Sequence, residues 1–194
     1  MANIRISSML TLAGVALLFR LVPYILYTLG VPIDPSSSAI YPWNISPILP
    51  LCIFGAACYQ SRSLVYVIPL AIYFLGDVGI WLITGQAEWA FYPTQPIVYL
   101  AVIFVTLWGL LLRHRRTIWR ITGTGLAGAI SFFIVSNLGS WFMWYPLTWE
   151  GLVECYTLAI PFFRHTLLSM VVFLPILFSK VTLKPVARSQ LQTT

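Results

Sequence analysis

Long apolar runs, separated by short segments that carry most of the charges, constrain this chain more than any other feature. A helix needs about 20 apolar residues to cross the ~30 Å of hydrocarbon in a bilayer. Six runs approach or reach that length, at residues 7–29, 46–60, 64–84, 94–112, 121–144 and 161–179. The sequence therefore predicts an all-α membrane protein with six transmembrane helices in a single domain over residues 1–194.

Composition excludes the main alternatives. Only 8% of the residues are charged and 59% are hydrophobic, whereas an ordinary soluble domain has roughly 25% charged residues. A soluble core of this length could not bury so much apolar surface. The net charge of +6 would also suit a nucleic-acid-binding protein, but the placement of the charges has another explanation, and we expect no nucleic-acid partner.

Basic and acidic residues fall in alternating connections between the runs. The basic connections hold Arg5, Arg62, Arg113, Arg115, Arg116, Arg120, Lys180, Lys184 and Arg188. The opposite connections hold Asp34, Glu88, Glu150 and Glu154. Because cytoplasmic loops are enriched in Lys and Arg, this pattern predicts that both termini are cytoplasmic and that the protein lies in a bacterial inner membrane.

The two longest external connections differ in character. Residues 30–45 are rich in Pro and Ser and predict an irregular loop. Residues 145–160 mix apolar and polar side chains, which favours a short interfacial or re-entrant helix. Thr148 is the expected N-cap of that helix.

Three charged residues, Arg20, Asp77 and Arg164, remain inside the apolar runs. Charges at membrane depth are costly and face the protein interior or water, so each is a functional candidate. At about 1.5 Å per residue, Arg20 and Asp77 lie ~20 Å from the cytoplasmic start of their helices, and Asn137 lies ~24 Å from its own. Arg164 and His165 enter from the external end of the last run. These five groups share the outer part of the membrane, which favours a wet pocket open to the outside.

Each of these residues also has a structural interpretation. Arg20 and Asp77 can form an ion pair that only fixes helix packing, and Arg164 can extend to the external headgroups. Asn137 can hydrogen-bond between helices, and His165 can be an ordinary satisfied polar residue. The sequence by itself leaves both interpretations open.

Tryptophan and tyrosine residues, Trp141 and Tyr156 among them, map mostly to the outer half of the predicted bundle. A plain interfacial belt would populate both faces. The bias suggests rings that line a site where a planar ligand stacks, although outer loops packed closely on the bilayer would give the same pattern.

Catalytic and metal-binding motifs are missing from the sequence. It has no HExxH, no P-loop and no nucleophile elbow, and its three cysteines form no CxxC pair. We therefore expect neither an enzyme nor a bound cofactor or metal.

Several strings resemble a known family. They are Asn44-Ile-Ser-Pro47 with Leu51–Gly55, Gly76-Asp77, Ser131–Asn137 with Trp141, and the segment from Tyr145-Pro146 to Phe163. Together they resemble an uncharacterised bacterial family described as transport proteins, which is itself similar to the six-helix substrate-binding S components of energy-coupling factor (ECF) vitamin transporters. The chain departs from that family at His165, where an Asn is usual, and at Met170, where an acidic residue is usual.

The resemblance implies an ECF S-component-like bundle that binds a vitamin- or metabolite-like small molecule, with a coupling transmembrane subunit and ATPases as partners. Arg20 and Arg164 would attract an anionic or zwitterionic ligand, Asp77 and Asn137 would orient it, and aromatic rings would stack on it. The predicted site comprises Arg20, Asn44, Asp77, Asn137, Trp141, Tyr156, Arg164 and His165. The alternative is a non-transporting membrane scaffold or assembly factor in which the intramembrane charges are structural.

Overall fold

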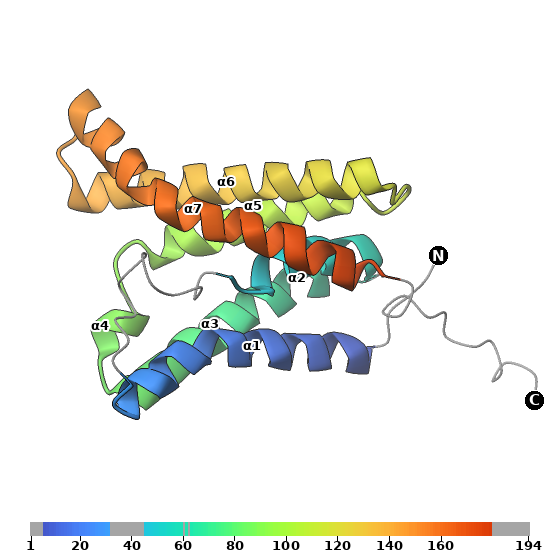
Figure 1. The fold of residues 1–194 in the computed structure, drawn as a ribbon, viewed down its shortest axis with the longest axis horizontal. Helices are drawn as coiled ribbons and strands as arrows, with labels where there is room; N and C mark the ends of the chain where they lie inside the picture. The colour runs from blue at the N-terminus through green and yellow to red at the C-terminus, as the bar shows by residue number, and fades with distance from the viewer. Residues whose placement is uncertain (1–5, 32–44, 60, 62, 180–194) are drawn as a thin grey trace, which may run out of the picture.

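Helices make up most of the part of the chain that the structure, a computed structural model, describes: residues 6–31, 45–59, 61 and 63–179 (Figure 1). In chain order they are α1 (Ile6–Thr28), α2 (Ile48–Cys58), α3 (Leu64–Thr84), α4 (Ala87–Ala90), α5 (Gln95–Leu110), α6 (Ile118–Trp144) and α7 (Trp149–Leu177). Five stretches are long and apolar enough to cross a membrane: Met9–Thr28, Leu64–Thr84, Ala87–Leu110, Ile118–Trp144 and Trp149–Leu177. The expectation of an all-helical membrane protein is confirmed at this level.

Helix α2 differs from the predicted second span. It has 11 residues, so at about 1.5 Å per residue it is only ~16 Å long, about half of the hydrocarbon thickness. All 11 of its residues are buried, because its sequence is apolar on every side and such a helix belongs in a core. It packs against each of the long helices α1, α3, α5, α6 and α7.

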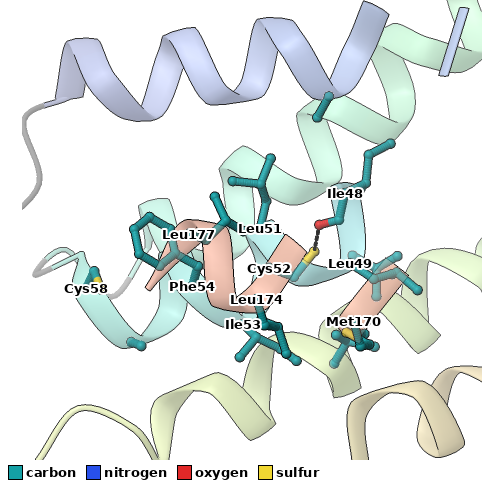
Figure 2. Packing of buried hydrophobic residues seen from close by; sticks show 14 of the residues in the cluster. Ile48, Leu49, Leu51, Cys52, Ile53, Phe54, Cys58, Met170, Leu174 and Leu177 are labelled. Carbon is teal, nitrogen blue, oxygen red and sulfur yellow. Dashed lines mark hydrogen bonds between the residues drawn. The ribbon is translucent and has the colours of Figure 1, made fainter. Parts of the chain in front are cut away.

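The long helices form two groups with α2 between them. Helices α1 and α3 pack together on one side, and α5, α6 and α7 pack together on the other (Figure 1). A close approach brings α2 against α5: a Cβ at Gly109 would lie 2.7 Å from the Cα of Ile53, so only glycine fits there. Figure 2 shows the apolar side chains of α2 meeting those of α7. Phe54 of α2 also lies edge-on to Phe178, the residue after α7, at 5.1 Å between ring centroids.

Charged connections separate to opposite ends of this bundle. We call the end that holds the α5–α6 connection, with Arg113, Arg115, Arg116 and Arg120, the basic end. The end that holds α4 and the α6–α7 connection, with Glu88, Glu150 and Glu154, is the acidic end. In Figure 1, α1 begins and α7 ends at the basic end. The chain also changes ends between α1 and α3, although α2 covers only part of that distance.

Two arginines of the α5–α6 connection hold the C-terminus of α2. The Arg113 guanidinium donates to the carbonyls of Ala56 (2.9 Å) and Tyr59 (3.2 Å), and Arg116 Nη2 donates to the carbonyl of Ala57 (2.6 Å). The last carbonyls of a helix lack partners within it, and cations are favourable beside them. These two arginines therefore stabilise the buried helix, independently of any effect of their charges on the orientation of the protein in the membrane.

Helix α7 replaces two predicted elements. Thr148 is its N-cap, as predicted, and the Thr148 side chain accepts a hydrogen bond from the Gly151 amide at 3.2 Å. The helix then continues from Trp149 to Leu177 without a break, so the separate interfacial helix within 145–160 is wrong. Pro161 lies inside α7 and costs one backbone hydrogen bond, which neighbouring helices make tolerable in a membrane. Most of the predicted loop at 30–45 lies outside the described residues.

Candidate functional site

A cavity of about 320 Å³ lies between the two helix groups. Its origin is the short length of α2: the cavity is lined by Ser46, Ile48 and Leu49 at the start of that helix and by none of its later residues. Among the described residues, α2 thus fills the basic half of the space between the groups and leaves a hollow beyond its N-terminus. The remaining lining residues are Arg20, Pro23, Tyr24, Tyr73, Tyr92, Val98, Phe132, Ser136, Phe162, Thr166 and Ser169.

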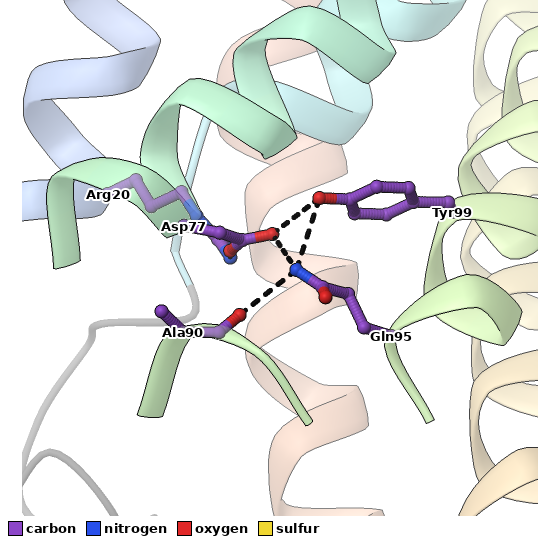
Figure 3. Close-up of polar contacts among 5 residues, drawn as sticks. All are labelled: Arg20, Asp77, Ala90, Gln95 and Tyr99. Atoms are coloured by element: carbon purple, nitrogen blue, oxygen red, sulfur yellow. Dashed lines mark hydrogen bonds and ion pairs between the residues drawn. The ribbon is translucent and has the colours of Figure 1, made fainter. Parts of the chain in front are cut away.

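Arg20 joins this cavity to a buried polar network (Figure 3). Its Nη2 forms an ion pair with Oδ1 of Asp77, a residue that is only 1% exposed. The other oxygen, Oδ2, accepts hydrogen bonds from Gln95 Nε2 at 2.6 Å and from the Tyr99 hydroxyl at 2.7 Å. Gln95 is held in turn by the Ala90 carbonyl at 3.0 Å. The predicted match in depth between Arg20 and Asp77 is therefore real, and Asp77 has a donor for each oxygen.

Packing contacts hold the Arg20 guanidinium in place, in addition to its ion pair with Asp77. Its Cζ lies 4.8 Å from the centroid of the Tyr73 ring, a distance typical of a cation–π contact. The side chain also crosses α3 at Gly76, where a Cβ would lie 2.6 Å from Arg20 Nε. That Nε is buried and has no hydrogen-bond partner among the described residues. Among those residues, the guanidinium donates only through Nη2.

Hydroxyl groups, aromatic rings and a few aliphatic side chains form the rest of the described cavity wall. The hydroxyls of Ser136 and Thr166 donate to carbonyls of their own helices, at 2.7 Å to Phe132 and 3.4 Å to Phe162. Ser169 Oγ accepts from the backbone amide of Ser46 at 3.0 Å. Hydroxyls that donate within their own helix keep oxygen lone pairs that can accept hydrogen bonds from a bound ligand. The wall can therefore hold a small molecule that has both an apolar body and polar groups.

The structure places most of the predicted site residues away from this cavity. Trp141 Nε1 donates to the Pro146 carbonyl at 2.9 Å, and the Tyr156 hydroxyl donates to the Ile134 carbonyl at 2.7 Å. Asn137 Nδ2 donates to the Phe133 carbonyl of its own helix at 2.8 Å. These contacts tie α6 to its own turns, to the α6–α7 connection and to α7.

The remaining predicted residues are also separate. Arg164 is exposed on α7. His165 is half-buried, and its Nδ1 is enclosed without a partner among the described residues. Asn44 lies outside the described residues. Of the predicted residues that the structure describes, Arg20 lines the cavity and Asp77 lies directly behind it.

On α6 and α7, the residues predicted from the sequence lie one position away from the residues that line the cavity. The predicted residues are Asn137 and His165, whereas their neighbours Ser136 and Thr166 face the cavity. The prediction also omitted Tyr24 and Tyr73, although each lies four residues from a charged partner of the ion pair and so on the same helix face. The spacing of four residues from Arg20 and from Asp77 is the sequence signal that could have identified these two tyrosines.

Among the residues described, no three His, Cys, Asp or Glu side chains come together as a metal site. Cys52, Cys58 and Cys155 are buried as free thiols. The arrangement supplies one cation, one shielded carboxylate, several hydroxyls and several aromatic side chains.

Comparison with known proteins adds one match. Residues 1–191 match DUF6580, a family of unknown function. No curated protein and no solved structure matches the chain.

Proposed function

We propose that this chain, which belongs to the DUF6580 family of unknown function, is a substrate-binding membrane subunit of a transporter. Its ligand is a small anionic or zwitterionic molecule, similar in kind to a vitamin or metabolite, and it occupies the cavity between the two helix groups. The observation that carries this proposal is a hollow of about 320 Å³ inside a membrane bundle, lined by an arginine, hydroxyls and aromatic rings. Small-molecule sites are of this size and have this mixture of apolar walls and a few polar groups.

Arg20 supports the anionic part of the ligand. It is the charged residue among the described lining residues. A guanidinium recognises carboxylate and phosphate groups through its planar set of donors. The rings of Tyr24, Tyr92 and Phe132 offer faces on which a planar body can stack.

The distribution of charge supports an orientation. Described basic residues of the connections lie at the basic end and acidic ones at the acidic end, so the positive-inside rule favours a cytoplasmic basic end and cytoplasmic termini. The cavity lies beyond the N-terminus of α2, toward the acidic end, so in this orientation it lies in the outer half of the bundle. We propose this orientation together with six crossings of a bacterial inner membrane and a bundle like that of ECF S components.

A coupling transmembrane subunit with ATPases is the partner that the resemblance implies. S components dock through an Ala-x-x-x-Ala motif, and this chain has Ala13-x-x-Ala16 in the corresponding helix. Ala16 is fully buried and Ala13 packs against the core. A coupling subunit would therefore use another face of the bundle.

The test is a thermal-shift screen of purified protein in detergent against vitamins, vitamin precursors and small anions. A ligand at 100 times its Kd stabilises the folded state by ~2.7 kcal/mol, which a melting curve resolves. A true cavity ligand should lose its effect in Ser136→Leu, which narrows the cavity. It should keep its effect in the matched control Ser140→Leu, one turn further along α6 and outside the lining. A hit that is equally strong in both variants would contradict the cavity assignment.

A membrane scaffold is the second candidate. The observation that favours it is the Asp77 network, because a carboxylate with donors on both oxygens already has a complete structural role. A scaffold predicts no stabilising ligand in the same screen. It also predicts that partner proteins are retained when the cavity is filled by Ser136→Leu.

A further inference from the structure

We propose that an anionic ligand enters this cavity together with one proton, and that Asp77 takes the proton. The inference rests on the proposed function and extends it, because a site that loads an anion and a proton together can draw on a proton gradient. Three observations carry it: the charge balance of the site, the different partners of the two Asp77 oxygens, and the shortage, among the described residues, of other groups around them that titrate near neutral pH.

The charge balance comes first. Arg20 and Asp77 form a neutral pair beside a cavity whose described wall holds no other charged residue. An added anion would leave a net negative charge in apolar surroundings, and uncompensated ions are expensive there. Uptake of one proton restores neutrality.

The partners of Asp77 show where a proton can reside. Oδ2 is held by Gln95 and Tyr99, both from α5, whereas Oδ1 is held among the described residues by Arg20 alone. When a ligand anion takes the hydrogen bond that Arg20 Nη2 donates to Asp77, Oδ1 loses that donor. A proton from the bulk solution, supplied by hydronium or the buffer acid, then forms the O–H bond at Oδ1, and the carboxyl group becomes neutral. The guanidinium keeps its charge and now neutralises the ligand.

Among the described residues, the other groups that interact with Asp77 are of kinds that do not ordinarily titrate near neutral pH. They are Arg20 and Tyr24 from α1, Tyr73 from α3 itself, Tyr92 before α5, and Gln95 and Tyr99 from α5. Arginine stays protonated, free tyrosine titrates only near pH 10, and glutamine does not titrate. Helix α2 contributes no charged residue, and α4 contributes only Glu88, which is exposed. Asp77 is thus the group of this set that can accept a proton.

The experiment uses benzenesulfonate as the probe, since its sulfonate stays ionised at every working pH, and benzenesulfonamide as the neutral isostere. Affinities are measured by calorimetry between pH 5.5 and 8 on the full chain in detergent. We expect the Kd of benzenesulfonate to fall about tenfold for each unit by which the pH is lowered, as for one linked proton. We expect the neutral isostere to bind without this dependence. Asp77→Asn should bind benzenesulfonate with a Kd that does not vary with pH.

His165→Asn is the matched control, because it removes the histidine of α7 that adjoins the lining residue Thr166. A pH dependence that persists in Asp77→Asn, or that disappears in His165→Asn, would assign the proton elsewhere and overturn the inference. Binding that is independent of pH in the wild type would overturn it while leaving the proposed function intact. No binding at any pH would count against both.

Infrared difference spectroscopy on the wild-type protein gives a reading that does not depend on a variant folding. Adding benzenesulfonate at pH 6 should produce the carbonyl stretch of a protonated carboxylic acid. Its absence, with the probe bound, would overturn the inference.

Discussion

Gly76 of α3 lies directly beneath the side chain of Arg20 of α1, so that a Cβ at position 76 would lie 2.6 Å from Arg20 Nε. The next residue along α3 is Asp77, the partner of that arginine. The absence of a side chain at one position thus allows the guanidinium to reach the carboxylate at the next. Packing and electrostatics at the cavity wall depend on each other through this pair of neighbours.

Gly76→Ala tests this dependence. The added methyl group displaces Arg20 from α3 and weakens its ion pair, and overpacking of this kind costs about 1–3 kcal/mol. We expect a clearly lower Tm in detergent. Gly14→Ala, on α1, is the control, because nothing lies within 4 Å of a Cβ there; its Tm should be unchanged or higher. Equal melting temperatures for both variants would mean that α3 and the Arg20 side chain can separate at Gly76 at little cost in free energy.

Removing one member of the ion pair should be worse than removing both. Asp77→Leu leaves the Arg20 charge without its carboxylate in a buried site, which costs about 3–5 kcal/mol. The double variant with Arg20→Met removes that charge and should recover much of the stability. Urea unfolding followed by tryptophan fluorescence measures the two variants against the wild type. A double variant that is less stable than Asp77→Leu would show that Arg20 stabilises the bundle independently of Asp77.

The arginines that hold α2 should matter for stability, whereas their neighbour should not. Arg113→Ala removes the donors to Ala56 and Tyr59, and hydrogen bonds to charged groups are worth about 1.5–3 kcal/mol. Arg116→Ala should act similarly through the Ala57 carbonyl. Arg115 is exposed, so Arg115→Ala removes the same charge and serves as the control. Melting temperatures that fall equally in all three would indicate an effect of net charge instead.

The proposed orientation can be read with a membrane-impermeant maleimide on intact cells. Glu88→Cys, at the acidic end, should be labelled from outside, and His114→Cys, at the basic end, should be labelled only after permeabilisation. Both positions are exposed, whereas the native Cys52, Cys58 and Cys155 are buried, so the unmodified protein gives the background. The reverse pattern would invert the topology.

Regular helix geometry explains what could be predicted of the fold. A long apolar run has to become a helix in lipid, since no water is present to satisfy its backbone. The run at 64–84 therefore coincides with α3, and that at 94–112 nearly coincides with α5. The same regularity relates position to depth, which is why Arg20 and Asp77 could be placed level with each other before any contact was known.

Rotation about each helix axis could not be predicted in the same way. Lipid is as apolar as a protein core, so a transmembrane helix carries little difference between its inner and outer faces, and a step of one residue turns the side chain by about 100°. The choice between Asn137 and Ser136, or between His165 and Thr166, was therefore made only by the packing of α6 and α7 against their neighbours. The same holds for α2, whose apolar sequence suits a short span as well as a buried half-helix.

The sequence by itself thus determined that the chain is a helical membrane protein, which connections lie at the same end, and that Arg20 and Asp77 lie at one depth. Only the tertiary structure decided that α2 is too short to fill the bundle, that a cavity lies beyond its N-terminus, and which side chains face that cavity. The physical reason is that length and depth follow from the fixed rise of a helix, whereas facing depends on neighbours that come from distant parts of the chain.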